Sequence, residues 1–573
     1  MGNKTRRAAV GLCLAAACLT VVFGSGCAGG QQGTSAGSDR LVAEKSSVRA
    51  TEYGDVVGVV SDGVEAYYNI PYGSDPTGDL RWHAPEAPKA WDGELDCSKS
   101  GKKALQMATV YDEDGNASVE QQGTTDCLNL DVYTSADAKD LPVLVYIHGG
   151  NNQTGTATEI GGSEVVARDD AVYVSLDYRL GLLGFNCLPA LLDDENPSGN
   201  FALLDIAAGL KWVQDNIAEF GGDPDNVTVS GFSAGGRNVM AMLVSPIFEG
   251  LFDKAIAYSG GMTISDQDES AQAIARTIAP LAVEDGKADT DGAAAEWLLQ
   301  DTDEVRDYLY GLDEGRLTAL MSDAGIRMSA FPHLFGDGVV LPKDGFSGVD
   351  YVNDVPIIML TGTDEFGMFC MNSPVYEELG DEGDAALGFA TKYGSDLYRI
   401  FNTQTSAAAM DPSYQSDMYL MQVNYGNASS GVQIDGLGSF HGIFAPMFGS
   451  HNYDAFFDFS EPGYQAMADV FHGYLKSFLH AGTPNSEESE VEWPVWTMDS
   501  KQTLVLDATD DGKAAVAVED VFKTPEQIIQ ELQADTSLSE DAKRRVVTEV
   551  MNGRWFSTLL DATYGTPQAV HLK

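Results

Sequence analysis

One short segment restricts most strongly the folds open to this chain: an apolar strand pattern that runs directly into a serine between glycines. Residues 227–229 have the composition of a buried strand, and they lead into Gly231-Phe232-Ser233-Ala234-Gly235. A helical pattern through Met240 and Leu243 follows at once. Glycines are needed here because larger side chains would clash where a strand turns sharply into a helix. The segment therefore predicts a strained turn that presents Ser233 at one edge of a sheet.

The same Gly-x-Ser-x-Gly pattern occurs once more, around Ser35, in a stretch rich in Gly, Ser and Gln with no strand pattern before it. Only Ser233 has the flanking strand and helix, which makes it the candidate nucleophile. The helix that follows would aim the N–H of Ala234 and its positive dipole end at a developing oxyanion.

The segments around this turn predict an α/β fold with a mostly parallel central sheet. Residues 142–147 and 171–176 are apolar runs of the kind found in strands buried on both faces. Residues 200–220 carry apolar side chains at helical spacing. The order strand, helix, strand, turn, helix is typical of an α/β core.

The flanking regions predict smaller elements. Residues 41–133 alternate over short segments with turn signals, which indicates antiparallel strands. Residues 265–330 and 371–435 show few buried-strand signals and are interpreted as helical insertions over one end of the sheet. Thr524 followed by Pro525 predicts the start of a further helix.

The charge balance excludes several classes of partner. The chain has 34 basic and 86 acidic residues, for a net charge of −52. Binding to nucleic acid needs clustered Lys and Arg, so we expect no nucleic-acid partner. Anionic lipid headgroups and polyanionic substrates are disfavoured by the same field. We interpret the acidity as the solvated surface of an exported protein, with cation collection as the alternative.

The first 26 residues are predicted to be a secretory signal peptide. Basic residues precede an apolar run over residues 8–23, which is too short to span a membrane. The run ends in Gly24-Ser25-Gly26-Cys27, which resembles the lipobox of bacterial lipoproteins, with Gly24 in place of the usual leucine.

Cys27 is therefore the expected lipidation site, and residues 27–45 are the expected flexible tether. Residues 46–573 would form the folded domain. We expect a cell-surface lipoprotein whose membrane contact is limited to this N-terminal anchor, with plain secretion as the alternative.

Beyond Cys27, four cysteines remain, at positions 97, 127, 187 and 370. In an oxidising compartment they allow up to two disulfides with three pairings, among which the sequence does not choose. No pair has C-x-x-C spacing, so no metal site is predicted.

A glycine-rich loop supplies further oxyanion candidates. The strand at residues 142–147 ends in His148-Gly149-Gly150-Asn151-Asn152, where close backbone approach would let Gly150 and Asn151 donate N–H groups alongside Ala234. Taken alone, such a glycine pair is equally consistent with an ordinary turn.

Many ordered motifs accompany these features, and together they resemble the type B carboxylesterases, an α/β-hydrolase family that includes bacterial aryl esterases, cholinesterases and bile-salt-activated lipases. The resemblance covers nearly all of residues 54–560. The motifs are Asn69-Ile70-Pro71-Tyr72, Leu80-Arg81-Trp82, Asp126 to Tyr133, Tyr178-Arg179-Leu180-Gly181, Phe220 to Pro224, Gly482-Thr483-Pro484-Asn485 and Trp493-Pro494.

The resemblance implies hydrolysis of carboxylic esters through an acyl-enzyme on Ser233, with a small-molecule ester as partner and no cofactor. The chain order in α/β-hydrolases is serine, acid, histidine. His441, which opens a motif similar to that of the family's catalytic histidine, would be the base. Glu365, after a strand pattern at residues 357–360, corresponds to the family's glutamate, with Asp364 as the lesser alternative.

Three residues depart from the family pattern. Phe232 and Phe444 stand where many members have glutamates that join a serine matching Ser259 in a polar network behind the triad. Their joint replacement predicts an apolar wall, which favours neutral apolar or aromatic esters. Asn151 stands where a third oxyanion glycine is usual.

Other functions remain open. No tryptophan lies between residues 98 and 127, where cholinesterases bind quaternary ammonium, so choline esters are not expected. Ala104 lies near the place of the family's first cysteine, and Cys97 could pair with Cys127 in a shifted register. A lipase or amidase on the same triad is one alternative. A non-catalytic surface binding protein is another, although such relatives typically lose the nucleophile.

Overall fold

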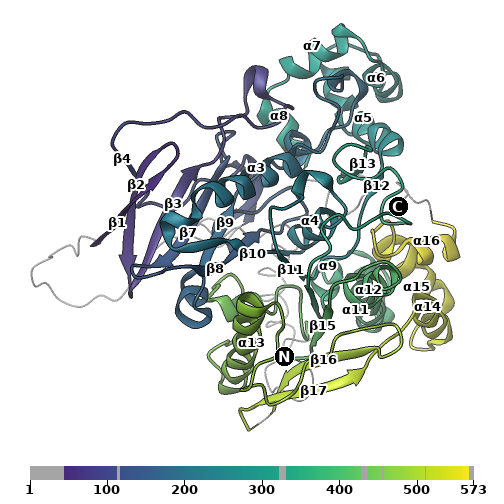
Figure 1. The fold of residues 1–573 in the computed structure, drawn as a ribbon. Coiled ribbons are helices and arrows are strands. Elements are labelled where there is room, and N and C mark those ends of the chain that lie inside the picture. The colour runs from purple at the N-terminus through teal and green to yellow at the C-terminus, as the bar shows by residue number, and fades with distance from the viewer. Residues whose placement is uncertain are drawn as a thin grey trace, which may run out of the picture.

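The computed structural model describes residues 44–111, 117–321, 331–426, 437–454, 457–509 and 511–566. Their elements surround one large sheet (Figure 1). The predicted signal peptide, Cys27 and most of the tether lie outside the described residues, so those expectations stay predictions. Within the described ranges, no helix has the length and apolar character needed to cross a membrane.

The central sheet has the strand order β1-β2-β3-β7-β9-β8-β10-β11-β14-β15-β16-β17, with β4 paired to β2. From β9 to β16 every neighbouring pair is parallel, whereas the pairs among β1, β2, β3, β7 and β9 and the pair β16–β17 are antiparallel. The expected α/β fold with a mostly parallel sheet and an antiparallel N-terminal part is confirmed.

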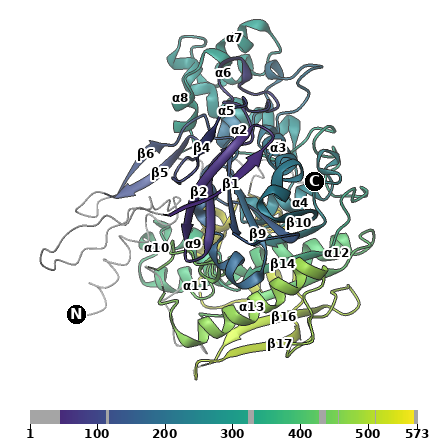
Figure 2. The ribbon, with the colours of Figure 1, turned by 60° about the vertical axis from the view of Figure 1, so that its left-hand side comes forward.

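The strands of this sheet are β1 Glu44–Thr51, β2 Gly54–Ser61, β3 Val64–Pro71, β4 Glu94–Asp96, β7 Asn129–Ser135, β8 Leu141–Ile147, β9 Val172–Leu176, β10 Gly222–Phe232, β11 Lys254–Tyr258, β14 Ile357–Gly362, β15 Met418–Val423, β16 Gln502–Ala508 and β17 Ala514–Asp520. Two small sheets pair β5 Gln106–Tyr111 with β6 Ala117–Gln122 and β12 Ser265–Asp266 with β13 Phe335–Gly336. Figure 2 shows the β5–β6 hairpin to one side of the N-terminal strands.

The helices are α2 Gly181–Gly184, α3 Phe201–Asn216, α4 Ala234–Met242, α5 Gln267–Glu284, α6 Asp291–Leu298, α7 Asp303–Gly311, α8 Glu314–Ala319, α9 Gly367–Cys370, α10 Val375–Glu378, α11 Gly383–Ile400, α12 Ser406–Met410, α13 Pro462–Ala481, α14 Pro525–Ala534, α15 Glu540–Arg545 and α16 Thr558–Tyr564. Figure 1 shows α5 to α8 gathered at one end of the molecule. Thr524 caps α14 in a capping box, as its sequence predicts.

Successive residues of the central strands feed two apolar cores, because side chains alternate across a sheet. In β8, Val143 and Val145 join a core with α3 and α4. Leu144 and Tyr146 join a second core, on the α13 side of the sheet. A third core joins α11 to the C-terminal helices α14 to α16. The central strands are thus covered on both faces, as their continuous apolar runs predict.

One prediction about the second insertion is wrong. Residues 371–435 do contain helices α10 to α12, but they also contain β15, a fully buried strand of the central sheet. Its residues, Met418 to Val423, include Tyr419 and Gln422 and lack a run of β-branched side chains. Its strand identity comes from pairing between β14 and β16, which is a tertiary effect that local composition does not report.

The four cysteines are free thiols in the buried interior, so the pairing of Cys97 with Cys127 that the sequence left open is not formed. Both side chains are packed in the apolar core with α3 and α4. Burial raises the pKa of the Cys97 thiol to about 12, which keeps the sulfur protonated and unreactive.

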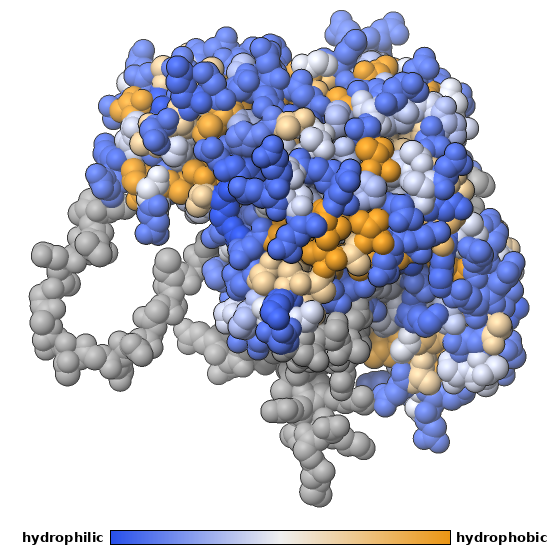
Figure 3. Space-filling view, turned by 60° about the horizontal axis from the view of Figure 1, so that its bottom comes forward, coloured by the Kyte–Doolittle hydropathy of each residue, from blue (hydrophilic) through white to orange (hydrophobic). Residues whose placement is uncertain are grey.

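Hydrophilic side chains cover most of the face shown in Figure 3, with apolar side chains gathered near its centre. No group of His, Cys, Asp and Glu suited to a metal ion occurs within the ranges described above.

Burial of His148 makes the stability of the fold depend on pH. The residue is wholly buried, and burial lowers the pKa of its imidazole to about 4, against about 6.5 in an unfolded chain. The unfolded chain therefore binds a proton that the folded chain does not. This contribution to stability is complete above about pH 6.5 and is lost as the pH falls toward 4, at up to about 1.4 kcal/mol per pH unit.

We therefore expect His148→Gln to flatten the fall of the unfolding free energy with acid, measured by urea denaturation between about pH 4 and pH 7. His451→Gln, at an exposed histidine, is the matched control and should retain the wild-type slope. A wild-type slope in His148→Gln would contradict the assignment.

Candidate active site

Ser233 lies on a sharp turn between β10 and α4. Its backbone has φ 56° and ψ −111°, in a region that side-chain-bearing residues seldom occupy. The Ser233 N–H donates to the carbonyl of Tyr258 at the end of β11, at 2.8 Å. Such strain persists only where the surroundings hold it, and it is characteristic of functional sites.

Two glycines beside the serine are required by close backbone approach. A Cβ at Gly231 would lie 2.4 Å from the carbonyl carbon of Gly235. A Cβ at Gly235 would lie 2.0 Å from the carbonyl oxygen of Ile147, at the end of β8. Both distances are shorter than atoms tolerate, so the glycine pattern in the sequence has a direct steric cause.

His441 and Glu365 form a buried pair beside this turn. The Nδ1 of His441 lies 2.7 Å from Oε2 of Glu365, which follows β14. The ring of His441 lies 4.5 Å, centroid to centroid, from the ring of Phe232, the residue before the serine. The pair thus has the arrangement in which a carboxylate keeps the proton on Nδ1 and leaves Nε2 as the base.

The other oxygen of Glu365 is held by three donors. Oε1 accepts hydrogen bonds from Ser259 Oγ at 2.6 Å, from Thr361 Oγ1 at 2.9 Å and from the N–H of Gly362. A buried carboxylate needs such partners to stay ionised. Asp364 instead accepts from the N–H of Ser439 at 3.3 Å, so Glu365 is the carboxylate that contacts the imidazole.

Aromatic side chains line the remaining sides of the imidazole. Phe232 packs edge to face against Phe444 with centroids 5.0 Å apart, and Phe444 stacks on Tyr258 at 4.3 Å. Phe369 and Tyr398 lie 4.8 and 5.6 Å from the ring of His441. The positions of the two family glutamates are therefore occupied by an apolar wall, while Ser259 still reaches the acid.

The loop after β8 lies against the serine. A Cβ at Gly149 would come within 3.3 Å of Ser233 Cβ. The Gly149 N–H donates to Oε2 of Glu159 at 2.9 Å, so this N–H is already engaged. Gly150 and Asn151 follow with φ of 87° and 55°, so the loop backbone turns at these two residues.

Three residues that hold this loop were missed from the sequence. Glu159 accepts from Gly149 N–H and from Tyr146 Oη, both at 2.9 Å. Arg237 and Asn238, in the first turn of α4, reach the side chains of Asn151 and Asn152. The local signal for Arg237 was a basic residue four positions after Ser233, and no motif in the sequence marks that position.

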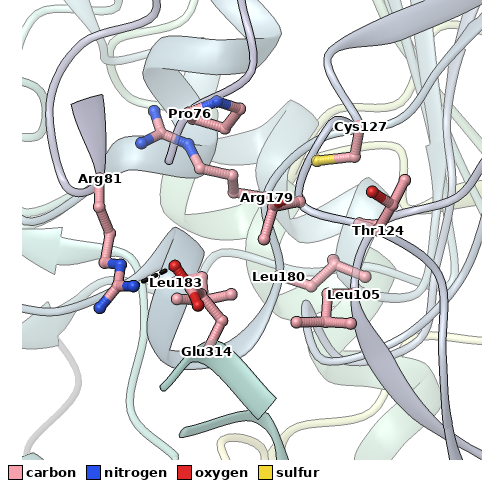
Figure 4. Close-up of a pocket in the computed structure, with 11 residues that line it drawn as sticks. Pro76, Arg81, Leu105, Thr124, Cys127, Arg179, Leu180, Leu183 and Glu314 are labelled. Atoms are coloured by element: carbon pink, nitrogen blue, oxygen red, sulfur yellow. Dashed lines mark hydrogen bonds and ion pairs between the residues drawn. The ribbon is translucent and has the colours of Figure 1, made fainter. Parts of the chain in front are cut away.

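The pocket in Figure 4 is a separate feature. It is lined mainly by apolar side chains such as Leu105, Leu180 and Leu183. Its two arginines are both paired, Arg81 with Glu314 and Arg179 with Asp205. None of the residues around Ser233 lines it, so the pocket is not part of the candidate site.

His472 and His480 lie on α13, away from the candidate site. His472 contacts Asp169 through Nδ1 at 2.9 Å and the carbonyl of Met447 through Nε2 at 2.9 Å. His480 contacts the carbonyl of Asp169 at 3.1 Å. Through these contacts both histidines link α13 to neighbouring segments of the chain.

The chain is similar to known esterases in both sequence and structure. The model of the carboxylesterase family matches residues 45–384. A para-nitrobenzyl esterase of Bacillus subtilis is 39% identical over 260 residues, which are 45% of this chain and 52% of that protein. An acylcarnitine hydrolase of Mus musculus is 35% identical over 344 residues, or 56% of this chain and 57% of that protein. The chain thus spans about half the length of these curated relatives.

Solved structures are similar over a longer part of the chain. A PNB esterase structure has a TM-score of 0.66 and 25% identity, covering 84% of this chain and 99% of its own. A carboxylesterase of Geobacillus stearothermophilus has a TM-score of 0.65 and 25% identity, with the same coverage. From the family match, which spans more than half of its length, the chain belongs to the carboxylesterase family.

Proposed function

We propose that this protein hydrolyses carboxylic esters through an acyl-enzyme formed on Ser233. The observation that carries the proposal is the hydrogen-bonded pair of His441 and Glu365 beside the strained turn of Ser233. Nucleophile, base and orienting acid follow in the chain order of α/β-hydrolases. Membership of the carboxylesterase family supports the same reaction.

In this mechanism His441 Nε2 accepts the proton of Ser233 Oγ as the oxygen attacks the ester carbonyl. The N–H groups of Gly150, Asn151 and Ala234 donate to the oxyanion of the tetrahedral intermediate. The imidazolium then protonates the leaving alcohol. A water molecule, activated by the same imidazole, releases the acid and regenerates the serine.

Glu365 keeps one position throughout the cycle. Its Oε2 faces the imidazole, and its Oε1 takes three hydrogen bonds, so the carboxylate is fixed in one orientation. It stabilises the imidazolium that forms during attack and sets which nitrogen of His441 acts as base.

The substrates we propose are small neutral esters with apolar or aromatic groups. Phe232, Phe369 and Tyr398 surround the imidazole, and the net charge of −52 disfavours polyanionic substrates. A lipase or amidase on the same triad remains the alternative within hydrolases, which turnover of long-chain esters and amides distinguishes. A non-catalytic binding protein is the alternative outside them.

Fluorophosphonate labelling tests the nucleophile. We expect the wild type to be labelled and to hydrolyse nitrophenyl esters, and we expect Ser233→Ala to lose the label and at least about 10³-fold in kcat. Ser35→Ala is the matched control, because Ser35 stands in the second Gly-x-Ser-x-Gly pattern, and it should retain both activities. Folded wild-type protein that takes no label would favour the binding-protein alternative.

The apolar wall generates a further prediction. Phe232 is buried between the rings of His441 and Phe444, so Phe232→Glu places a carboxylate there without a partner. We expect lower ester turnover and a lower melting temperature than in Phe232→Leu, which keeps the site apolar. Equal turnover and stability in the two variants would contradict an apolar environment at this position.

A further inference from the structure

Arg237 is a buried cation at the candidate site. It lies in α4 four residues after Ser233, and only 1% of its surface is exposed. No carboxylate forms an ion pair with it in the part of the chain that the structure describes. Burial lowers the pKa of its guanidinium to about 10, which leaves it charged at neutral pH. A buried charge without a counter-ion is costly. The role of Arg237 is therefore sought in its contacts with uncharged groups.

Those contacts are all to uncharged groups. Nη2 donates to Oδ1 of Asn151 at 2.7 Å, and Nη1 contacts Nε2 of His333 at 2.9 Å. The guanidinium lies 4.2 Å above the ring of Trp555, and its Nε has no hydrogen-bond partner among the described residues. The positive charge is therefore not neutralised where it touches the loop.

His333 is held as a neutral acceptor for this arginine. Its Nδ1 lies 3.1 Å from the carbonyl of Phe331, which can only accept, so Nδ1 carries the proton and Nε2 accepts from Arg237. Burial, together with the charge of Arg237, holds the pKa of His333 well below its usual range. His333 and Trp555 thus hold the guanidinium in place, and its Nη2 reaches the side chain of Asn151.

The side-chain contact of Asn151 bears on its backbone conformation. Its φ of 55° lies in the left-handed region, which is open to glycine, is strained for most other residues, and is reached by Asn when its side chain is hydrogen-bonded. Asn152 has a φ of 56° and exchanges amide hydrogen bonds of 3.0 and 3.1 Å with Asn238. Two consecutive residues of α4 therefore hold two consecutive left-handed residues of the loop.

We propose that Arg237 is a positioning residue that holds Asn151 through its side-chain amide, so that the Asn151 N–H faces the oxyanion. The proposal rests on the proposed function. The Arg237–Asn151 contact takes the place of the third glycine, whose backbone would adopt this turn without help. An N–H held toward the oxyanion stabilises the transition state more than the ground state, because the negative charge develops there.

A double-mutant cycle on the full chain tests this proposal, with kcat and KM for a nitrophenyl ester as readouts. We expect Arg237→Met to lower kcat at least about tenfold and to change KM less than about threefold, because the held N–H acts in the transition state. In an Asn151→Gly background, where glycine adopts the turn without a tether, Arg237→Met should lower kcat less than about threefold. The rate of fluorophosphonate inactivation should follow kcat.

Two further variants separate positioning from stability. Arg81→Met removes another buried arginine, outside the candidate site, and should leave kcat unchanged even where the melting temperature falls. Asn151→Ala leaves Arg237 in place but removes its acceptor, so we expect the same loss of kcat, which keeps the test available if Arg237→Met does not fold.

Equal losses of kcat in the wild-type and Asn151→Gly backgrounds would overturn the proposal, as would an unchanged kcat in Arg237→Met. A wild type that takes no fluorophosphonate label and hydrolyses no ester would instead remove the proposed function, and this inference with it. If the wild type is labelled and active but the double-mutant cycle is additive, the role of Arg237 is rejected and the proposed function stands.

Discussion

The site depends on the close approach of three backbone segments at the turn of Ser233. The serine N–H is bonded to the end of β11, while Gly235 lies where a side chain would strike the end of β8. The turn can therefore form only between these two strands. Because the carboxyl ends of parallel strands meet at one edge, the segments that follow β8, β11 and β14 bring the loop at residues 148–152, Ser259 and Glu365 to that edge.

Polar and apolar groups are divided sharply around this edge. Glu365 receives hydrogen bonds on both oxygens, and the imidazole beside it is enclosed by aromatic rings. Arg237, by contrast, meets neutral partners alone among the described residues. The carboxylate of Glu365 is thus met by hydrogen-bond donors. The guanidinium of Arg237 has no ion-pair partner among the described residues, and it lies next to the loop where negative charge is proposed to develop. This division is what an electrostatically organised site requires.

Much of this architecture could be predicted because its signals are local. The glycines around Ser233 report a steric requirement within five residues, and the apolar runs of β8, β9 and β14 report burial on both sheet faces. The strand β15 escaped prediction because its pairing partners, rather than its composition, make it a strand. Arg237 escaped because its partners, Asn151 and His333, lie 86 and 96 residues away, and no periodicity records such contacts.

The wide spacing of the site along the chain has a consequence for how the protein folds. The loop after β8, the turn at Ser233, the acid after β14 and the histidine at position 441 are separated by long stretches of sequence, and they meet only when the parallel strands between them have paired. Contacts of such sequence separation form slowly, since loop closure precedes the gain from each pairing. A refolding chain can therefore regain its helices and much of its compactness while the candidate site is still unassembled, so recovery of that site is a late marker of the native state.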